Sequence, residues 1–220
     1  VIYFSPEILR AMHPQRHESN RLFWDKIAIA SGFRFHPRSM LHMEYSQLEN
    51  EHVSRLQFFE RIQPAALNQY SMEWLLKNRD LHMDMLREAG RRSDGHVSRY
   101  VLAAEKVRPG DTVLDAACGL GYGTAVLAAC SRGARFIGVD IDDTSVAYAN
   151  ANFAAENKAI SFHASDVCRL SFLLDHSVDI VVSFETIEHL PNYNAFFAEI
   201  KRVLKPDGRI IGSVPNRWCD

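Results

Sequence analysis

The sequence predicts an α/β protein with a doubly wound, mostly parallel β-sheet, preceded by a helical N-terminal region. Two observations carry this prediction. From about residue 95 onward, short apolar runs typical of buried strands alternate with segments of helical periodicity, a pattern typical of βαβ units. A glycine cluster, GLGYG, also follows the first apolar run and opens a helical segment, where the backbone must turn tightly.

The expected elements alternate along the second half of the chain. Strands are expected at Thr112–Asp115, Arg135–Asp140, Ile160–Ala164, Val178–Phe184 and Arg209–Val214. Helices are expected at Thr124–Ser131, Asp143–Asn157 and Asn194–Leu204, the last closed by a turn at Lys205–Gly208. Right-handed crossovers between parallel strands then give a Rossmann-like sheet with helices on both faces. The chain stops just after the fifth expected strand, so we expect further C-terminal strands to be missing.

The pattern divides the chain into residues 1–94 and residues 95–220. In the first region apolar residues recur at helical spacing, as at Leu56, Phe59 and Ile62, and prolines interrupt the pattern. Six of the ten histidines lie there, but none has the spacing of a metal site. We expect short helices of unknown role in this region, and we hypothesise that they cover the substrate side of a pocket formed by the second.

Composition and charge exclude several classes of protein. With 25 Lys and Arg against 27 Asp and Glu, the net charge of −2 argues against a nucleic-acid binder that relies on a basic surface. The sequence has no run of about 18 apolar residues, so it predicts no membrane-spanning helix. The first residues also lack the features of a signal peptide. The four cysteines lie far apart without a CxxC pair, which favours a reducing, cytoplasmic compartment.

Candidate functional residues gather where the expected parallel strands end, which is where such sheets bind ligands. Each one alone also fits a turn or a helix cap. Their joint occurrence, with an acid about 20 residues beyond the first glycine, predicts a ligand that carries a nucleoside. The candidates are Asp115 with Gly119 and Gly121 after the first strand, Asp140 at the end of the second, Asp166 and Val167 after the third, and Phe184, Glu185, Glu188 and His189 after the fourth.

The spacing of the glycines separates two nucleoside cofactors. Dinucleotide-binding loops use GxGxxG to place a pyrophosphate at a helix N-terminus, whereas this loop reads GxGxG and follows the acid Asp115. A sulfonium with an amino-acid tail needs no phosphate cradle, and a nearby carboxylate favours a cationic ligand. The loop therefore favours S-adenosylmethionine over NAD(P), and no Tyr-x-x-x-Lys pair supports an oxidoreductase.

At these residues the sequence resembles the class I S-adenosylmethionine-dependent methyltransferases. The resemblance covers roughly residues 95–216 and lies in VLDAACGLGYG, GVDID, SDV, FETIEHL and LKPDGRIIGSVPN, in that order. It implies that the glycines approach the methionine part and that the remaining residues contact the other parts of the cofactor. The implied contacts are Asp140 for the ribose, Asp166 and Val167 for the adenine, the Phe184 backbone for the methionine amine, and Arg99 for the carboxylate, although Arg99 equally fits a surface helix. Ile141 is a further expected cofactor contact.

The ExxEH stretch formed by Glu185, Glu188 and His189 has two interpretations. On one helical turn the three side chains share a face and suit a divalent ion such as Mg²⁺, and the pattern resembles the metal site of ubiquinone-pathway and small-RNA methyltransferases. In the alternative, which the sequence favours, no metal is used and His189 acts as a general base oriented by the glutamates. The absence of a further histidine after His189 weakens an RNA acceptor.

These inferences predict an enzyme that transfers a methyl group in line from S-adenosylmethionine to a small-molecule acceptor, with a hydroxyl oxygen as the expected accepting atom. Two alternatives stay open: a binding protein that keeps the fold without catalysis, and a methyltransferase for RNA or another acceptor. The sequence carries no signal for an oligomeric state.

Overall fold

The computed structural model describes residues 91–155 and 157–214, which hold the predicted alternating region up to Val214 except for residue 156. The prediction of a helical region at 1–94 falls almost entirely outside the described residues. Helix α6, Arg91–Ala104, runs across the predicted boundary between residues 94 and 95. The division of the chain into two regions therefore stays a prediction.

Within the described residues, five strands form one sheet in the order β3-β2-β1-β4-β5, and every neighbouring pair is parallel. The strands are β1, Thr112–Ala116, β2, Arg135–Asp140, β3, Ile160–Ala164, β4, Val178–Phe184, and β5, Leu204–Ser213. The predicted bounds of β2, β3 and β4 are confirmed, because each segment is rich in the β-branched and aromatic residues that favour strands. The chain adds strands on one side of β1 and then on the other, which is the doubly wound order.

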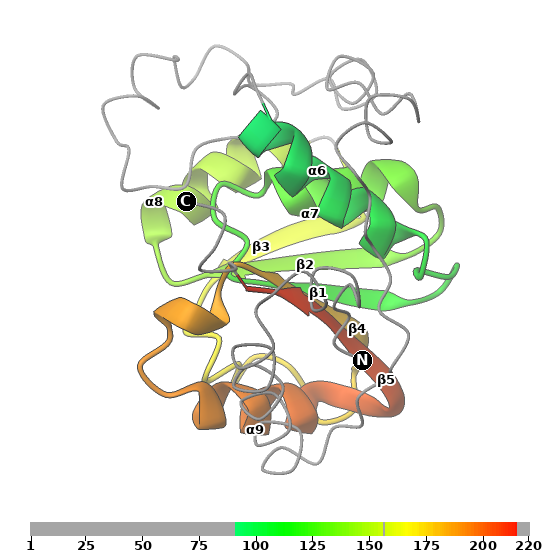
Figure 1. Cartoon of the computed structure of the whole chain (residues 1–220). Helices are drawn as coiled ribbons and strands as arrows, with labels where there is room; N and C mark the ends of the chain where they lie inside the picture. Colours follow the sequence, from blue (N-terminus) through cyan, green and yellow to red (C-terminus); the bar gives the residue numbers. More distant parts are fainter. Residues whose placement is uncertain (1–90, 156, 215–220) are drawn as a thin grey trace, which may run out of the picture.

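The helices lie on both faces of this sheet, as predicted. They are α7, Tyr122–Cys130, α8, Asp143–Ala149, with a π-helical turn at Asn150–Ala154, a short 3-10 helix η2, Ile187–His189, and α9, Tyr193–Val203. The side chains of Asp142 and Asn192 accept hydrogen bonds from the first turns of α8 and α9, which explains where those helices begin. Figure 1 shows α6, α7 and α8 covering one face and α9 covering the other.

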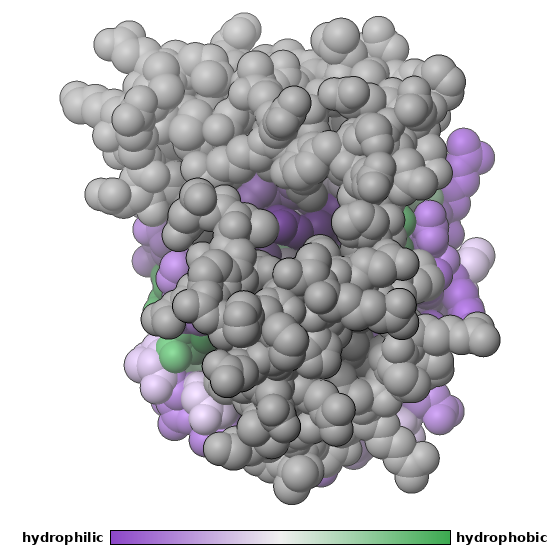
Figure 2. All heavy atoms as spheres, viewed as in Figure 1, coloured by the Kyte–Doolittle hydropathy of each residue, from purple (hydrophilic) through white to green (hydrophobic). Residues whose placement is uncertain are grey.

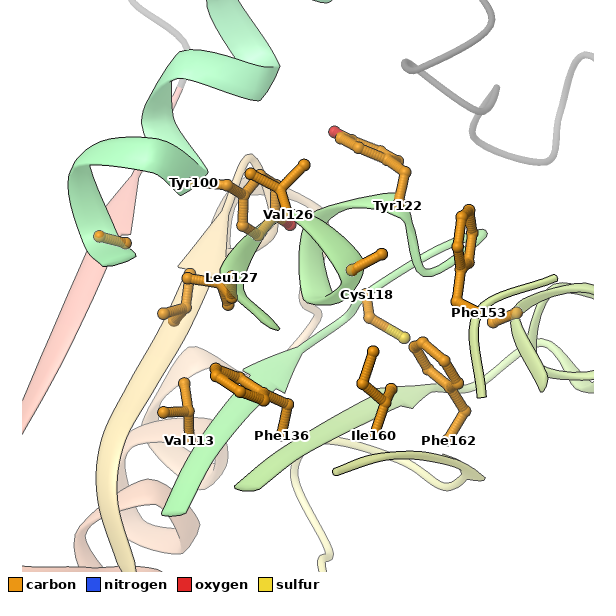
Figure 3. Close-up of a cluster of buried hydrophobic side chains, with 14 of the residues drawn as sticks. Tyr100, Val113, Cys118, Tyr122, Val126, Leu127, Phe136, Phe153, Ile160 and Phe162 are labelled. Atoms are coloured by element: carbon orange, nitrogen blue, oxygen red, sulfur yellow. The ribbon is translucent and has the colours of Figure 1, made fainter. Parts of the chain in front are cut away.

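Two hydrophobic clusters fill the space between the sheet and these helices. In the first, Phe136, Ile160 and Phe162 of the sheet face Val126 and Leu127 of α7, and none of the five is more than 7% exposed (Figure 3). The second cluster joins the opposite face of the sheet to α9 and to the segment after β3. Burying one such side chain contributes roughly 1.5–3 kcal/mol, so both faces of the sheet are held by apolar packing.

Strand β5 begins earlier than predicted, at Leu204 rather than at Arg209. Leu204 pairs with Val178 and Arg209 pairs with Ile180, so the residues between them form an irregularity in β5. The Lys205 ammonium donates to both carboxylate oxygens of Asp179 at 2.8 Å, which anchors this irregular stretch to the start of β4. The predicted turn at 205–208 is therefore wrong, because a contact between distant residues keeps the stretch in the sheet.

The surface of the described part is mainly hydrophilic in the view of Figure 2, with only small hydrophobic areas. Its exposed large apolar side chains are Ile141, Phe172, Leu174 and Tyr193. Among the described residues, no helix has the length and apolar character needed to cross a bilayer.

Candidate functional site

The candidate residues meet at the carboxyl ends of the strands, at the point where the strand order reverses between β1 and β4. The loops after β1 and β4 diverge there because the chain runs to opposite sides of the sheet. Such a switch point leaves a crevice at the edge of a parallel sheet, which is where ligands bind in this architecture.

The loop after β1 depends on backbone conformations that favour glycine. Ala117, Gly119 and Gly121 all have positive φ angles, of 65°, 54° and 81°. A Cβ atom on Gly121 would lie 2.6 Å from the Cβ of Ala149 and 2.8 Å from the ring of Phe162. The loop therefore packs directly against α8 and β3, and a larger residue at Gly121 would push it away.

Asp140 links this loop to the end of β2. Its Oδ2 accepts a hydrogen bond of 2.8 Å from the backbone N–H of Gly119, and its Oδ1 accepts one of 3.0 Å from Asp142. The next residue, Ile141, is an apolar side chain that is 75% exposed. A partly exposed carboxylate beside an exposed apolar side chain fits a ribose with its attached base.

Asp166 and Val167 follow β3, the neighbour of β2. The Oδ1 of Asp166 accepts a hydrogen bond of 2.8 Å from the backbone N–H of Cys168, and the residue is exposed. Val167 is 5% exposed and packs into the second hydrophobic cluster. The carboxylate of Asp166 is thus held by its own turn, with Val167 anchoring the backbone beneath it.

Asp115 points into the protein interior and is 1% exposed. Thr124 of α7 donates a hydrogen bond of 2.7 Å to its Oδ2, and the hydroxyl of Tyr100 on α6 donates to its Oδ1 at 3.3 Å. Burial raises the pKa of Asp115 from 3.8 to about 7, although these two hydrogen bonds lower it. The carboxylate therefore joins β1 to both helices, and its predicted contact with a cofactor stays a prediction.

A second polar group joins α6 to the ends of β4 and β5. The Oε1 of Glu185 accepts a hydrogen bond of 2.6 Å from Ser213 and lies 3.7 Å from Nη2 of Arg99. Glu185 has a φ of 53°, which turns it out of the strand direction directly after Phe184. The ring of Phe184 packs edge-on against Tyr100, with the ring centroids 4.9 Å apart. Arg99, Phe184 and Glu185 are therefore neighbours, and their predicted roles at a cofactor stay predictions.

Glu188 and His189 lie on η2, just beyond this group. Oε1 of Glu188 is 3.8 Å from Nε2 of His189, and the imidazole side chain is 68% exposed. Partial burial raises the pKa of Glu188, and the nearby charge of Glu185 adds to this rise. His189 therefore presents an exposed imidazole beside a carboxylate.

The prediction of a magnesium site at these residues is not supported. Among the described residues, no group of three or more histidine, cysteine, aspartate or glutamate side chains is arranged to hold a metal ion. The prediction needed Glu185, Glu188 and His189 on one α-helical turn. Glu185 has a left-handed backbone and bonds to Ser213, and the 3-10 helix begins only at Ile187. The three side chains consequently do not form a ligand set.

Comparison with known proteins shows what the described part of the chain is similar to. Residues 114–212 match the family model described as a methyltransferase domain. A probable S-adenosylmethionine-dependent methyltransferase of Mycolicibacterium smegmatis is 40% identical over 108 residues, which are 49% of this chain and 39% of that protein. Residues 114–212 therefore form a methyltransferase domain, similar to those of S-adenosylmethionine-dependent methyltransferases. The predicted family and fold class are confirmed.

Another curated relative matches a similar share of this chain. The ubiquinone biosynthesis O-methyltransferase of Idiomarina loihiensis is 32% identical over 108 residues, covering 49% of this chain and 44% of that protein. The chain thus spans less than half the length of these curated relatives. Two solved structures share the fold. A geranyl diphosphate methyltransferase has a TM-score of 0.51 and 19% identity, and the match covers 59% of this chain and 48% of that one. The [4+2]-cyclase SpnF has a TM-score of 0.50 and 22% identity, and the match covers 57% of this chain and 47% of that one.

Sequence reasoning missed three residues of the methyltransferase domain that shape the site. Tyr100 and Thr124 hold Asp115, and Ser213 holds Glu185. Thr124 lies in the first turn of the helix that the glycine loop opens, so its closeness to the strand carried a local signal. Tyr100 and Ser213 approach their partners only through the fold, and spacing along the chain gives no sign of it.

Proposed function

We propose that this domain binds S-adenosylmethionine and directs its methyl group to a small-molecule acceptor with a hydroxyl oxygen. The hydrogen bond between Gly119 and Asp140 carries the proposal, because it brings the glycine loop and the acid after β2 together at the switch point. When bound, S-adenosylmethionine supplies a methyl group on a positively charged sulfur, and its departure leaves a neutral thioether. The protein therefore needs to supply alignment rather than an acid for the leaving group.

The residues at the strand ends divide the binding of the cofactor among them. Asp140 accepts hydrogen bonds from the ribose hydroxyls, and Asp166 accepts one from the exocyclic amine of adenine, with Ile141 and Val167 beside the base. The loop at Gly119 and Gly121, the Phe184 backbone and the Arg99 guanidinium hold the amino-acid part. The exposure of Ile141 and Asp166 supports this division, because both remain accessible to a ligand.

His189 is the candidate base for the acceptor. A hydroxyl oxygen must lose its proton as it forms the new O–C bond, and an exposed imidazole can take up that proton as a general base. Glu188, at 3.8 Å from Nε2 of His189, stabilises the imidazolium that results. Glu185 is committed to Ser213 and Arg99 and acts as a positioning residue in this proposal.

The relatives of this domain include a sterol 24-C-methyltransferase, a phosphoethanolamine N-methyltransferase and a ubiquinone biosynthesis O-methyltransferase, so the accepting atom varies among them. The hydroxyl assignment rests on His189, because a neutral amine attacks without prior loss of a proton. The second candidate is a protein that binds the cofactor without transferring its methyl group. This candidate stays open because the fold also occurs in a [4+2]-cyclase, so the fold alone does not establish methyl transfer.

The test is transfer of a labelled methyl group by the full chain to panels of hydroxyl, amine and carbon acceptors. We expect turnover with hydroxyl acceptors that falls about 10²–10⁴-fold in His189→Ala, with unchanged affinity for S-adenosylmethionine. His163→Ala is the matched control, since His163 is an exposed imidazole on β3 that stacks on Phe172. Turnover with amine or carbon acceptors alone, or full activity of His189→Ala, contradicts the proposal. Tight cofactor binding without any turnover supports the binding protein instead.

A further inference from the structure

The segment from Ser165 to Ser177, between β3 and β4, contains turns but no helix or strand. It carries Asp166 and Val167 at its start. A segment without regular structure cannot satisfy its backbone polar groups by itself and relies on other parts of the fold to hold its course. The position of the two candidate adenine contacts therefore depends on what fixes this segment.

Arg202, in the last turn of α9, supplies much of that fixation. Its Nη2 donates to the carbonyl of Leu170 at 2.9 Å, and its Nη1 donates to the carbonyl of Leu173 at 2.9 Å. Nη1 also donates to Oδ1 of Asp175 at 2.6 Å. The remaining two hydrogen bonds, from Nε and Nη2, go to the carboxylate of Glu199 at 3.0 and 2.7 Å. A guanidinium has five N–H donors, and all five have an acceptor here.

Glu199 completes the arrangement from the preceding turn of α9. Its Oε1 accepts a hydrogen bond of 2.6 Å from the backbone N–H of Leu170. The hydrogen bonds from Arg202 lower the pKa of Glu199, so the carboxylate stays charged. Both backbone polar groups of Leu170 are thus bound by this one pair of side chains.

Leu170 is linked to Asp166 by a tight turn. The N–H of Arg169 donates to the carbonyl of Asp166 at 2.8 Å, and the N–H of Cys168 donates to the Asp166 side chain at 2.8 Å. The burial of Leu170, which is 0% exposed, keeps the segment against α9 but does not by itself fix its backbone, because apolar packing is non-directional. The hydrogen bonds to its N–H and carbonyl supply the missing direction.

We propose that Arg202 and Glu199 are positioning residues that set the selectivity of this domain for an adenine base. They do so by fixing Leu170 and, through the turn, the carboxylate of Asp166. This inference rests on the proposed function, in which Asp166 accepts a hydrogen bond from the exocyclic amine. Neither residue touches the cofactor in this account, and their effect reaches it only through the course of the segment.

The experiment compares two ligands that differ at the recognised amine and at the neighbouring ring nitrogen N1, which gains a proton. The dissociation constants of the full chain are measured for S-adenosylhomocysteine and for S-inosylhomocysteine, in which a carbonyl replaces the amine. The wild-type chain is expected to prefer the adenine ligand by about tenfold or more, the scale of a hydrogen bond to a charged group. In Arg202→Met this preference is expected to fall to about two- to threefold. The matched control is Lys201→Met, an exposed residue of the same helix turn, which is expected to keep the wild-type preference.

A ratio of two dissociation constants separates positioning from stability. A variant that merely unfolds more readily loses apparent affinity for both ligands by the same factor, so its ratio does not change. Should Arg202→Met fail to fold, Glu199→Gln keeps the size of the side chain and an acceptor for Leu170 but weakens the pairing with Arg202. It is expected to lower the preference by a smaller factor.

The outcomes distinguish this inference from the proposed function. A wild-type preference that disappears in Asp166→Ala but persists in full in Arg202→Met or Glu199→Gln overturns the positioning role alone. A wild-type chain without any preference overturns both the assignment of Asp166 and the inference built on it. Loss of the preference in Arg202→Met and Asp166→Ala, with Lys201→Met unchanged, supports both.

Discussion

The buried carboxylate of Asp115 makes the stability of this domain depend on pH near neutrality. Burial raises its pKa from 3.8 to about 7 in the folded state, while the hydrogen bonds from Thr124 and Tyr100 lower it. Because the pKa is higher in the folded state, the protonated form favours folding. Its contribution is complete below the unfolded-state pKa and is lost as the pH rises through about 7.

The size of this effect follows from the two pKa values. For a carboxyl with a pKa of 3.8 when unfolded and about 7 when folded, the contribution to the free energy of unfolding falls by about 2.5 kcal/mol between pH 5 and pH 8. Asp115→Asn removes the titrating group and keeps a polar side chain of the same shape. Relative to wild type, this variant is therefore expected to gain about 2.5 kcal/mol across that range.

The assay is urea unfolding of the full chain and of Asp115→Asn at four pH values from about 5 to 8, with the free energies of unfolding compared at each. Asp179→Asn serves as a control. Partial burial raises the pKa of Asp179, but its hydrogen bonds with Lys205 and Thr112 outweigh this and lower it. Its titration therefore lies below the range, and its difference from wild type should be constant. Parallel pH profiles of wild type and Asp115→Asn would refute the reasoning.

Three further predictions concern packing around the site. In Gly123→Ala the new Cβ would overlap the ring of Tyr100, so we expect the free energy of unfolding to fall by about 1–3 kcal/mol in urea titrations. Thr124→Val removes a hydrogen-bond donor to Asp115 and should lower the free energy of unfolding by about 1–3 kcal/mol at pH 8. Because this hydrogen bond lowers the pKa of Asp115, its loss should also move the pH-dependent fall in stability to higher pH. Ile200→Ala, at a residue with 0% exposure under the opposite face, should cost about 2–5 kcal/mol by the same measurement and leave cofactor affinity unchanged. Wild-type stability of any of these variants contradicts the packing described.

Much of the sheet could be predicted because the bounds of three of its strands depend on the local sequence. The bounds of β2, β3 and β4 follow from short segments rich in β-branched and aromatic residues. The alternation of these segments with helices then predicts a parallel sheet. The start of β5 was not predictable in this way. It depends on pairing between Leu204 and Val178 and on the ion pair of Lys205 with Asp179, which join residues about 26 positions apart.

The site residues likewise differ in whether local sequence or long-range contacts determine their positions. The glycine loop and Asp140 were predicted from their spacing, and the hydrogen bond of Gly119 to Asp140 confirms that the fold brings them together. The magnesium interpretation, which the sequence favoured less than a metal-free one, is not supported because it needed a helical backbone at Glu185, whose φ of 53° depends on the course of the chain at the end of β4. The role of Arg202 was out of reach because its acceptors are carbonyls about 30 residues away, which no side-chain pattern reveals.

Calorimetric titration of the full chain with S-adenosylmethionine, with NADH as the comparison ligand, tests the central claim most directly. We expect micromolar affinity for S-adenosylmethionine and none for NADH, with binding weakened about tenfold or more in Asp140→Ala through loss of the ribose contacts. Asp143→Ala is the control, an exposed acid in the first turn of α8. Failure of the wild-type chain to bind S-adenosylmethionine, or equal affinity in Asp140→Ala, would contradict the assignment of this strand-end site as the cofactor site.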